Sequence, residues 1–188
     1  NPDSDRRFDT LSASFGASYE LAPRVRFGVN VSRSERAPSA EELFANGPHA
    51  GTQAFEIGNP DFGTEKAWGV EATLKGSGDG WSLAASAYHS WYDGFIYDAP
   101  TGEIEDDLPV FQYNQADARY YGFEIEASKR RARAGGFSIN ADAMADMVHA
   151  TIVGEGPAPR IPPLRIMGGL EAQSDQLNAR VEIEHSFE

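Results

Sequence analysis

The chain has 188 residues, of which 40% are hydrophobic, and its 29 acidic and 16 basic residues give a net charge of -13. This length allows one domain with a core of its own, and the acidic balance disfavours nucleic acid, which binds to a basic face. Cysteine is absent, which excludes disulfides and thiolate metal sites, and no stretch approaches the roughly 20 apolar residues of a membrane-spanning helix.

Apolar and polar residues alternate with a period of two in eight stretches of the chain. In the first, Leu11, Ala13 and Phe15 share one face, while Ser12 and Ser14 share the other. Because successive side chains of a strand point to opposite faces, each stretch predicts a β-strand with one apolar and one polar face. The stretches are 11–21, 25–32, 68–75, 81–90, 122–128, 137–144, 164–171 and 177–187. Several approach the roughly 9–11 residues with which a tilted strand crosses a bilayer.

The connections between these strands are alternately short and long. The short ones are Ala22–Arg24, Ser77–Gly80, Lys129–Gly136 and Ser174–Gln176, and the long ones are Glu35–Gly63, Asp98–Pro109 and Ala150–Pro163. In an up-and-down sheet this order puts the short turns at one end and the long loops at the other, as in outer-membrane barrels. We therefore predict an all-β fold: an antiparallel, up-and-down transmembrane β-barrel segment of about eight strands, with long extracellular loops and short periplasmic turns.

Aromatic residues gather near the predicted strand ends, including Trp81, Trp91, Tyr120 and Tyr121. Rings with a polar edge suit the boundary between lipid and water, so this placement favours an interfacial girdle. Aromatic residues are also common in strands of soluble proteins, which is the alternative explanation.

The first long connection carries signals of local structure. Ser39 and Glu42 form a capping box, in which each side chain can bond to the backbone N–H of the other. We expect a short helix through about Ala45, closed by the turn Asn46-Gly47-Pro48. Residues 35–63 are therefore predicted to be a long, structured extracellular loop, and such loops on a rigid sheet commonly carry function.

The segment Ser34–Leu74 resembles the corresponding barrel segment of TonB-dependent outer-membrane receptors, and is most similar to their zinc-uptake branch. The matching parts are Arg36-Ala37-Pro38, Glu42-Leu43-Phe44-Ala45, Gly47-Pro48-His49, Phe55-Glu56 and Gly58-Asn59-Pro60. Phe95–Ser128 and Pro159–Glu171 extend the resemblance, which thus covers most of the chain.

The resemblance implies a larger barrel of about 22 strands with a globular plug in its lumen. Residues 1–188 would be part of that barrel domain, with the plug domain and the C-terminal strands outside this chain. The implied function is uptake of a scarce nutrient, either zinc or a metal complex such as a siderophore or haem, across the Gram-negative outer membrane. The implied partners are the TonB energy-coupling complex, acting through the plug, outer-membrane lipid, and the metal or metal-chelate ligand.

The candidate ligand-binding loop residues are Glu42, Asn46, His49 and Glu56, and His49 is the candidate metal ligand. A neutral imidazole together with carboxylates suits zinc, which would be the transported ligand and not a resident cofactor. An exposed loop histidine without a ligand is the alternative. No G-x-S-x-G, H-E-x-x-H or phosphate-binding glycine motif is present, so we do not expect an enzyme.

Two other architectures fit the alternation. One is a complete, small eight-stranded barrel with a structural or adhesive role, whose first and last strands would pair. The other is a soluble β-sandwich that binds a ligand, in which Val29, Val70, Ile125 and Val181 would meet across a dry interior.

Overall fold

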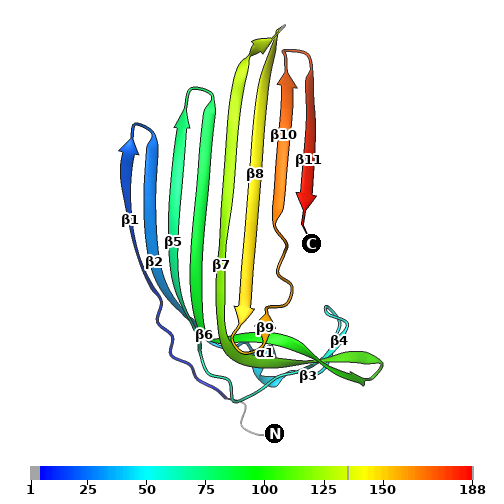
Figure 1. Cartoon of the computed structure of the whole chain (residues 1–188). Helices are drawn as coiled ribbons and strands as arrows, with labels where there is room; N and C mark the ends of the chain where they lie inside the picture. Colours follow the sequence, from blue (N-terminus) through cyan, green and yellow to red (C-terminus); the bar gives the residue numbers. More distant parts are fainter. Residues whose placement is uncertain (1–4, 135, 188) are drawn as a thin grey trace.

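Eight long strands form one antiparallel sheet in a computed structural model that describes residues 5–134 and 136–187 (Figure 1). The strands are β1 (Ala13–Ala22), β2 (Val25–Arg36), β5 (Glu65–Gly78), β6 (Trp81–Glu105), β7 (Leu108–Ala134), β8 (Phe137–Ile152), β10 (Arg165–Gln173) and β11 (Asn178–Ser186). Their order in the sheet is their order in the chain, and each pairs antiparallel with the next. This up-and-down, all-β arrangement confirms the predicted fold class.

The sheet is open, because β1 and β11 end the path of paired strands and do not pair with each other within the described residues. The complete eight-stranded barrel is therefore wrong. The sandwich is also wrong, because Val29, Val70, Ile125 and Val181 are 38%, 39%, 42% and 69% exposed instead of meeting across a dry interior. None of the described helices is long and apolar enough to cross a membrane.

The two faces of the sheet differ in chemistry, as the alternation predicts. On the apolar face of β6, Trp81 and Trp91 lie at opposite ends of a band formed by Leu83, Ala85, Ala87 and His89. The ten residue steps between them span roughly 34 Å of strand, or about 24 Å at a tilt of about 45°. This agrees with the apolar band of outer-membrane barrels, which is about 25 Å tall and flanked by aromatic girdles.

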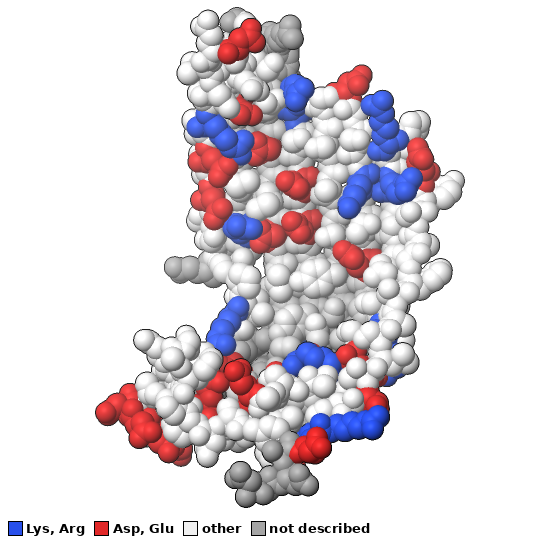
Figure 2. Space-filling view, turned by 180° about the vertical axis from the view of Figure 1, so that it is seen from behind, with Lys and Arg blue, Asp and Glu red and all other residues white. Residues whose placement is uncertain are grey.

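The other face carries charged side chains over most of the sheet, as Figure 2 shows. Toward β10 and β11 these charges are paired. Arg180 binds Asp142 through two hydrogen bonds of 2.7 and 2.8 Å, and Arg165 lies 2.8 Å from Asp146. A charged surface needs water or a polar partner, and the division into one charged and one apolar face is typical of outer-membrane barrels, whose polar face lines the lumen.

Short elements form a layer at the end of the sheet opposite the short turns (Figure 1). They are the helix α1 (Ala40–Phe44) and the strands β3 (Asn46–His49), β4 (Ala54–Ile57) and β9 (Gly156–Pro157). β3 and β4 form a hairpin, and β4 pairs in parallel with β7, from Phe55 opposite Val110.

We call this layer of α1, β3, β4 and β9 the mouth layer. The buried core lies in it, in two clusters. Leu43, Phe62 and Ile96 form the first cluster, and Tyr97, Ala150, Ile152 and Ala158 form the second. The first joins the helix to β6, and the second joins β6 to β8 and the segment after it. The mouth layer is therefore packed onto the extended ends of the strands.

Three local predictions are wrong. Lys129–Gly136 is mostly strand and not a turn, because β7 continues to Ala134 and β8 begins at Phe137. Asp98–Pro109 is not a loop, because β6 and β7 continue through it to a turn at Asp106 and Asp107, both at positive φ. Asn46–Pro48 is not the turn that closes the helix, because the helix ends at Phe44 and Asn46 already begins β3. The long connections are instead residues 37–64, which contain α1, β3 and β4, and residues 153–164, which contain β9.

Candidate functional site

Arg36, the last residue of β2, fixes the start of the long loop. Its guanidinium lies 2.8 Å from a carboxylate oxygen of Glu42 and 2.8 Å from one of Glu65, so it bridges helix α1 and strand β5. Glu65 is 9% exposed and also accepts a 3.0 Å hydrogen bond from the backbone N–H of Ile96. The hydrogen bond to Glu65 raises the pKa of Arg36 above its ordinary value, so the guanidinium of Arg36 is charged at every physiological pH.

The helix start is the predicted capping box. The backbone N–H of Glu42 donates to Ser39 Oγ over 3.1 Å, and the backbone N–H of Ser39 donates to Glu42 Oε2 over 2.7 Å. The carboxylate of Glu42 thus serves both the helix cap and Arg36. Both oxygens of the Glu42 carboxylate therefore already accept hydrogen bonds, from the backbone N–H of Ser39 and from the guanidinium of Arg36.

The end of the loop is held against β7 by Gln115. The Gln115 amide accepts from the backbone N–H of Gly63 over 3.1 Å and donates to the carbonyl of Gly63 over 3.0 Å. It also donates to the carbonyl of Gly94 over 2.8 Å. With both of its ends fixed, the loop presents the β3–β4 hairpin in a defined place.

His49 and Glu56 meet in this hairpin. His49 Nδ1 lies 3.1 Å from Glu56 Oε1 and 3.2 Å from Thr52 Oγ1. The Thr52 hydroxyl donates to Glu56 Oε1 over 2.7 Å, and the Tyr113 hydroxyl of β7 donates to Glu56 Oε2 over 3.1 Å. The Glu56 side chain is 7% exposed and that of His49 is 46% exposed, so a half-exposed imidazole stands over a buried carboxylate.

The surroundings keep this carboxylate ionised. Burial alone would raise the pKa of Glu56, but the hydrogen bonds from Thr52 and Tyr113 and the nearby His49 outweigh it, and the pKa is lowered. Burial, followed by the charge of Glu56, raises the pKa of Tyr113 to about 12. At neutral pH Tyr113 is therefore a hydrogen-bond donor and Glu56 an anion that can attract a cation toward His49.

The structure brings together only part of the predicted residue set. His49 and Glu56 are in contact, whereas Glu42 is bound by Arg36, and Asn46 is an exposed residue opposite Ile57. Among the residues that the structure describes, no group of three or more His, Cys, Asp and Glu side chains could hold a metal ion. Sequence reasoning missed Thr52 and Tyr113, and nothing in the sequence indicates that Tyr113 lies 3.1 Å from Glu56.

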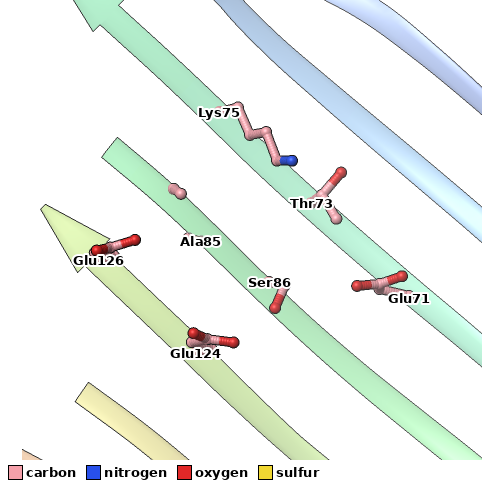
Figure 3. A pocket seen from close by; sticks show the side chains of 8 residues that line it. Glu71, Thr73, Lys75, Ala85, Ser86, Glu124 and Glu126 are labelled. Atoms are coloured by element: carbon pink, nitrogen blue, oxygen red, sulfur yellow. The ribbon is translucent and has the colours of Figure 1, made fainter. Parts of the chain in front are cut away.

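A second candidate region lies on the charged face of the sheet. A hollow of about 240 Å³ is lined by Glu71 and Lys75 of β5, Ser86 of β6, and Glu124 and Glu126 of β7. Figure 3 shows that Glu71 and Glu124 lie on either side of Ser86. Three carboxylates against one ammonium group give this part of the lumen wall a negative charge, unlike the paired charges near β11.

Solved structures with a similar fold include three transport receptors. The copper transporter OprC has a TM-score of 0.76 and 22% identity over 92% of this chain and 26% of its own. The siderophore receptor PirA from Acinetobacter baumannii has a TM-score of 0.63 and 15% identity over 92% of this chain and 28% of its own. The PirA from Pseudomonas aeruginosa has a TM-score of 0.52 and 14% identity over 91% of this chain and 34% of its own. The chain thus spans about a quarter to a third of these proteins, and at such identities the likeness establishes the fold.

The likeness does not confirm the zinc-uptake branch, because the copper transporter OprC is among the similar structures. The family itself is defined by a sequence model described as "TonB dependent receptor-like, beta-barrel", which matches residues 1–175. This match covers the long loop and most of the strands that position it. The chain therefore belongs to the TonB-dependent receptor-like β-barrel family.

Proposed function

We propose that this chain is part of the barrel wall of an outer-membrane receptor that takes up a metal ion or a metal complex. Proteins of its family are transporters of the Gram-negative outer membrane and not enzymes. The plug domain and the remaining strands would belong to the full-length protein, and the TonB energy-coupling complex would act through the plug. Zinc is the metal that the sequence favours. The similar copper and siderophore receptors extend the proposal to copper and to metal chelates.

The observation that supports this proposal most directly is the pair of His49 and Glu56 on an ordered layer at the loop end of the sheet. An imidazole with an adjacent carboxylate is a suitable donor pair for zinc or copper. The bonds from Thr52 and Tyr113 fix the orientation of Glu56, which is the role that outer partners play in metal sites. Two protein donors leave the other coordination positions to water or to a chelator.

The lumen wall supports the same ligand class. Glu71, Glu124 and Glu126 line a negatively charged hollow on the face that would border the transport path. Carboxylates along such a path raise the local concentration of cations. A cationic ligand or a cationic chelate would therefore meet favourable charge at the mouth and along the wall.

Metal titration of the full-length receptor, with His49→Ala and Glu56→Gln variants, tests the site. We expect either change to weaken zinc or copper binding by at least about 10-fold, because each removes a donor, and loss of even an outer partner of a metal site costs about 10- to 100-fold. His185→Ala is the matched control, because His185 is an exposed histidine on the apolar face of β11. Unchanged affinity in the His49 variant would refute the assignment of His49. A receptor that binds neither metal, siderophore nor haem would refute the ligand class.

A further inference from the structure

Two of the three methionines of the chain lie directly opposite each other on the charged face of the sheet. They are Met144 of β8 and Met167 of β10. The register continues on both sides, where Glu126 of β7 is opposite Met144 and Glu184 of β11 is opposite Met167. Four neighbouring strands thus contribute one row of two thioethers between two carboxylates, which we call the methionine row. Glu126 also lines the hollow in Figure 3, so the row adjoins that hollow.

The register allows both thioethers of the row to reach one ion. Side chains of directly opposite residues project from the same face of a sheet, with their Cβ atoms about 4.5–5.5 Å apart. Methionine is unbranched and has three rotatable bonds, so its sulfur can turn toward a neighbour. Met144 and Met167 are both partly exposed. An ion above the row could therefore be held by two sulfur atoms, with a carboxylate beside them.

The arginines beside the row are already paired with carboxylates. On the side of the loop end, Arg165 lies 2.8 Å from Asp146. On the side of the short turns, Arg180 lies 2.7 Å from Asp142 and 2.7 Å from Glu182. Each of these cations thus has a close anionic partner in its own row, and the methionine row itself contains no positive charge.

The carboxylates of the row are less committed. Glu126 forms no hydrogen bond or ion pair with the residues that the structure describes. Glu184 lies 3.9 Å from Arg165, which binds Asp146 more closely. Two neutral sulfur atoms between two such anions favour a cation. The row therefore combines soft donor atoms with the negative charge that attracts a metal ion.

We propose that the methionine row binds copper as the monovalent ion, as transported cargo on the lumen wall. The proposal deepens the proposed function and rests on its assignment of the charged face to the lumen, but it does not depend on the pair of His49 and Glu56. Thioethers select monovalent copper, whereas zinc takes imidazole, thiolate and carboxylate donors. Because the chain contains no cysteine, thioethers are its soft donors. The ion arrives and leaves in the same oxidation state, so no electron transfer takes place in the row.

Monovalent silver tests the row, because it is a soft ion like monovalent copper and is not oxidised in air. The full-length receptor, in detergent and with methyl-labelled methionine, is titrated with Ag⁺ and followed by NMR. The methyl signals of Met144 and Met167, identified by their loss in leucine variants of similar volume, should shift together. Met144→Leu should raise the Ag⁺ concentration that shifts the Met167 signal by at least about 10-fold, because it removes a donor. Glu126→Gln should raise it by about fivefold, since one nearby charge is lost.

Met147→Leu is the matched control, because Met147 lies opposite Phe123 on the apolar face of the same strand. Its own methyl signal should not respond to Ag⁺, and its substitution should leave the response of the row unchanged. Signals of Met144 and Met167 that do not shift, or that respond equally to Zn²⁺, would overturn the proposal. If these signals stay unchanged in a receptor that binds zinc through His49, the methionine row alone is refuted. If the row responds while His49→Ala leaves zinc binding unchanged, the assignment of His49 alone is refuted.

Discussion

Removal of Arg36 tests whether the mouth layer is held by one charged bridge. The side chains of its partners Glu42 and Glu65 are 14% and 11% exposed, whereas that of Arg36 is 44% exposed. Truncating one partner of a fully buried pair costs about 3–5 kcal/mol, and an exposed pair contributes about 0–1 kcal/mol. Arg36→Ala falls between these limits, because it leaves two poorly hydrated carboxylates without their cation. We expect a loss of about 2–3 kcal/mol in the local stability of the loop.

Hydrogen–deuterium exchange of the full-length receptor measures this loss directly. The protected amides of residues 37–64 should exchange about 30- to 150-fold faster in Arg36→Ala, because they exchange through local opening. Arg36→Lys should be intermediate, since an ammonium group cannot bind two carboxylates in a planar fork. Arg24→Ala is the control, because Arg24 and Asp79 are both exposed and 3.9 Å apart. Unchanged protection of the loop in Arg36→Ala would refute the reasoning.

Two further predictions concern the same layer. Gly58→Ala should destabilise the loop by about 1–3 kcal/mol, since its new Cβ would lie 2.8 Å from the backbone of Ala45, whereas Gly47→Ala has open space and should be neutral in the same exchange experiment. The pKa of Glu56 is lowered, so its contribution to loop stability is complete above the ordinary carboxyl pKa of about 4.3 and is lost as the pH falls through the lowered value. Exchange measured above and below the lowered pKa of Glu56 should show a larger acid loosening in the wild type than in Glu56→Gln, and Tyr113→Phe should move the contribution of Glu56 to higher pH.

The long strands could be predicted because one rule applies to every residue in them: successive side chains point to the apolar and to the polar face of the sheet in turn. The sequence of each strand therefore has a period of two wherever it crosses the apolar band. From Trp81 to Trp91 the odd positions face outward, and the sequence shows them as apolar or aromatic with His89 among them. The order of connections then determines the up-and-down path of the strands.

The same rule fails beyond the band, where strands are covered on both faces. Ile96 and Tyr97 are adjacent in β6 and both buried, because one packs on Leu43 and Phe62 while the other packs on Ala150 and Ile152. Ala54, Phe55 and Glu56 in β4 are likewise buried in succession. Without alternation these segments look like loops in the sequence. The error at Asp98–Pro109 has the opposite cause, because Pro100–Glu105 are exposed on both faces of the hairpin and therefore show no alternation either.

Only those contacts of the candidate site that join residues close in sequence could be predicted. The capping box of Ser39 and Glu42 depends on a fixed spacing of three residues, and the structure contains it. The contact of His49 with Glu56 depends on the β3–β4 register, and that of Tyr113 with Glu56 depends on packing between segments 57 residues apart. Neither leaves a signal in composition or spacing.

The carboxylates of the loop differ in their bonding partners, and this difference explains why one connection contains so many residues. Glu42 and Glu65 are bound by Arg36, so they hold the loop in place and have little capacity left for a ligand. Glu56 is instead bound by neutral hydroxyls and an imidazole, and no arginine or lysine among the described residues pairs with its carboxylate. A binding site must be held in place before the ligand arrives, or binding must provide the free energy to order it. In the proposed site these two tasks are separated, because charged bridges fix the layer while one buried carboxylate lies beside an accessible histidine.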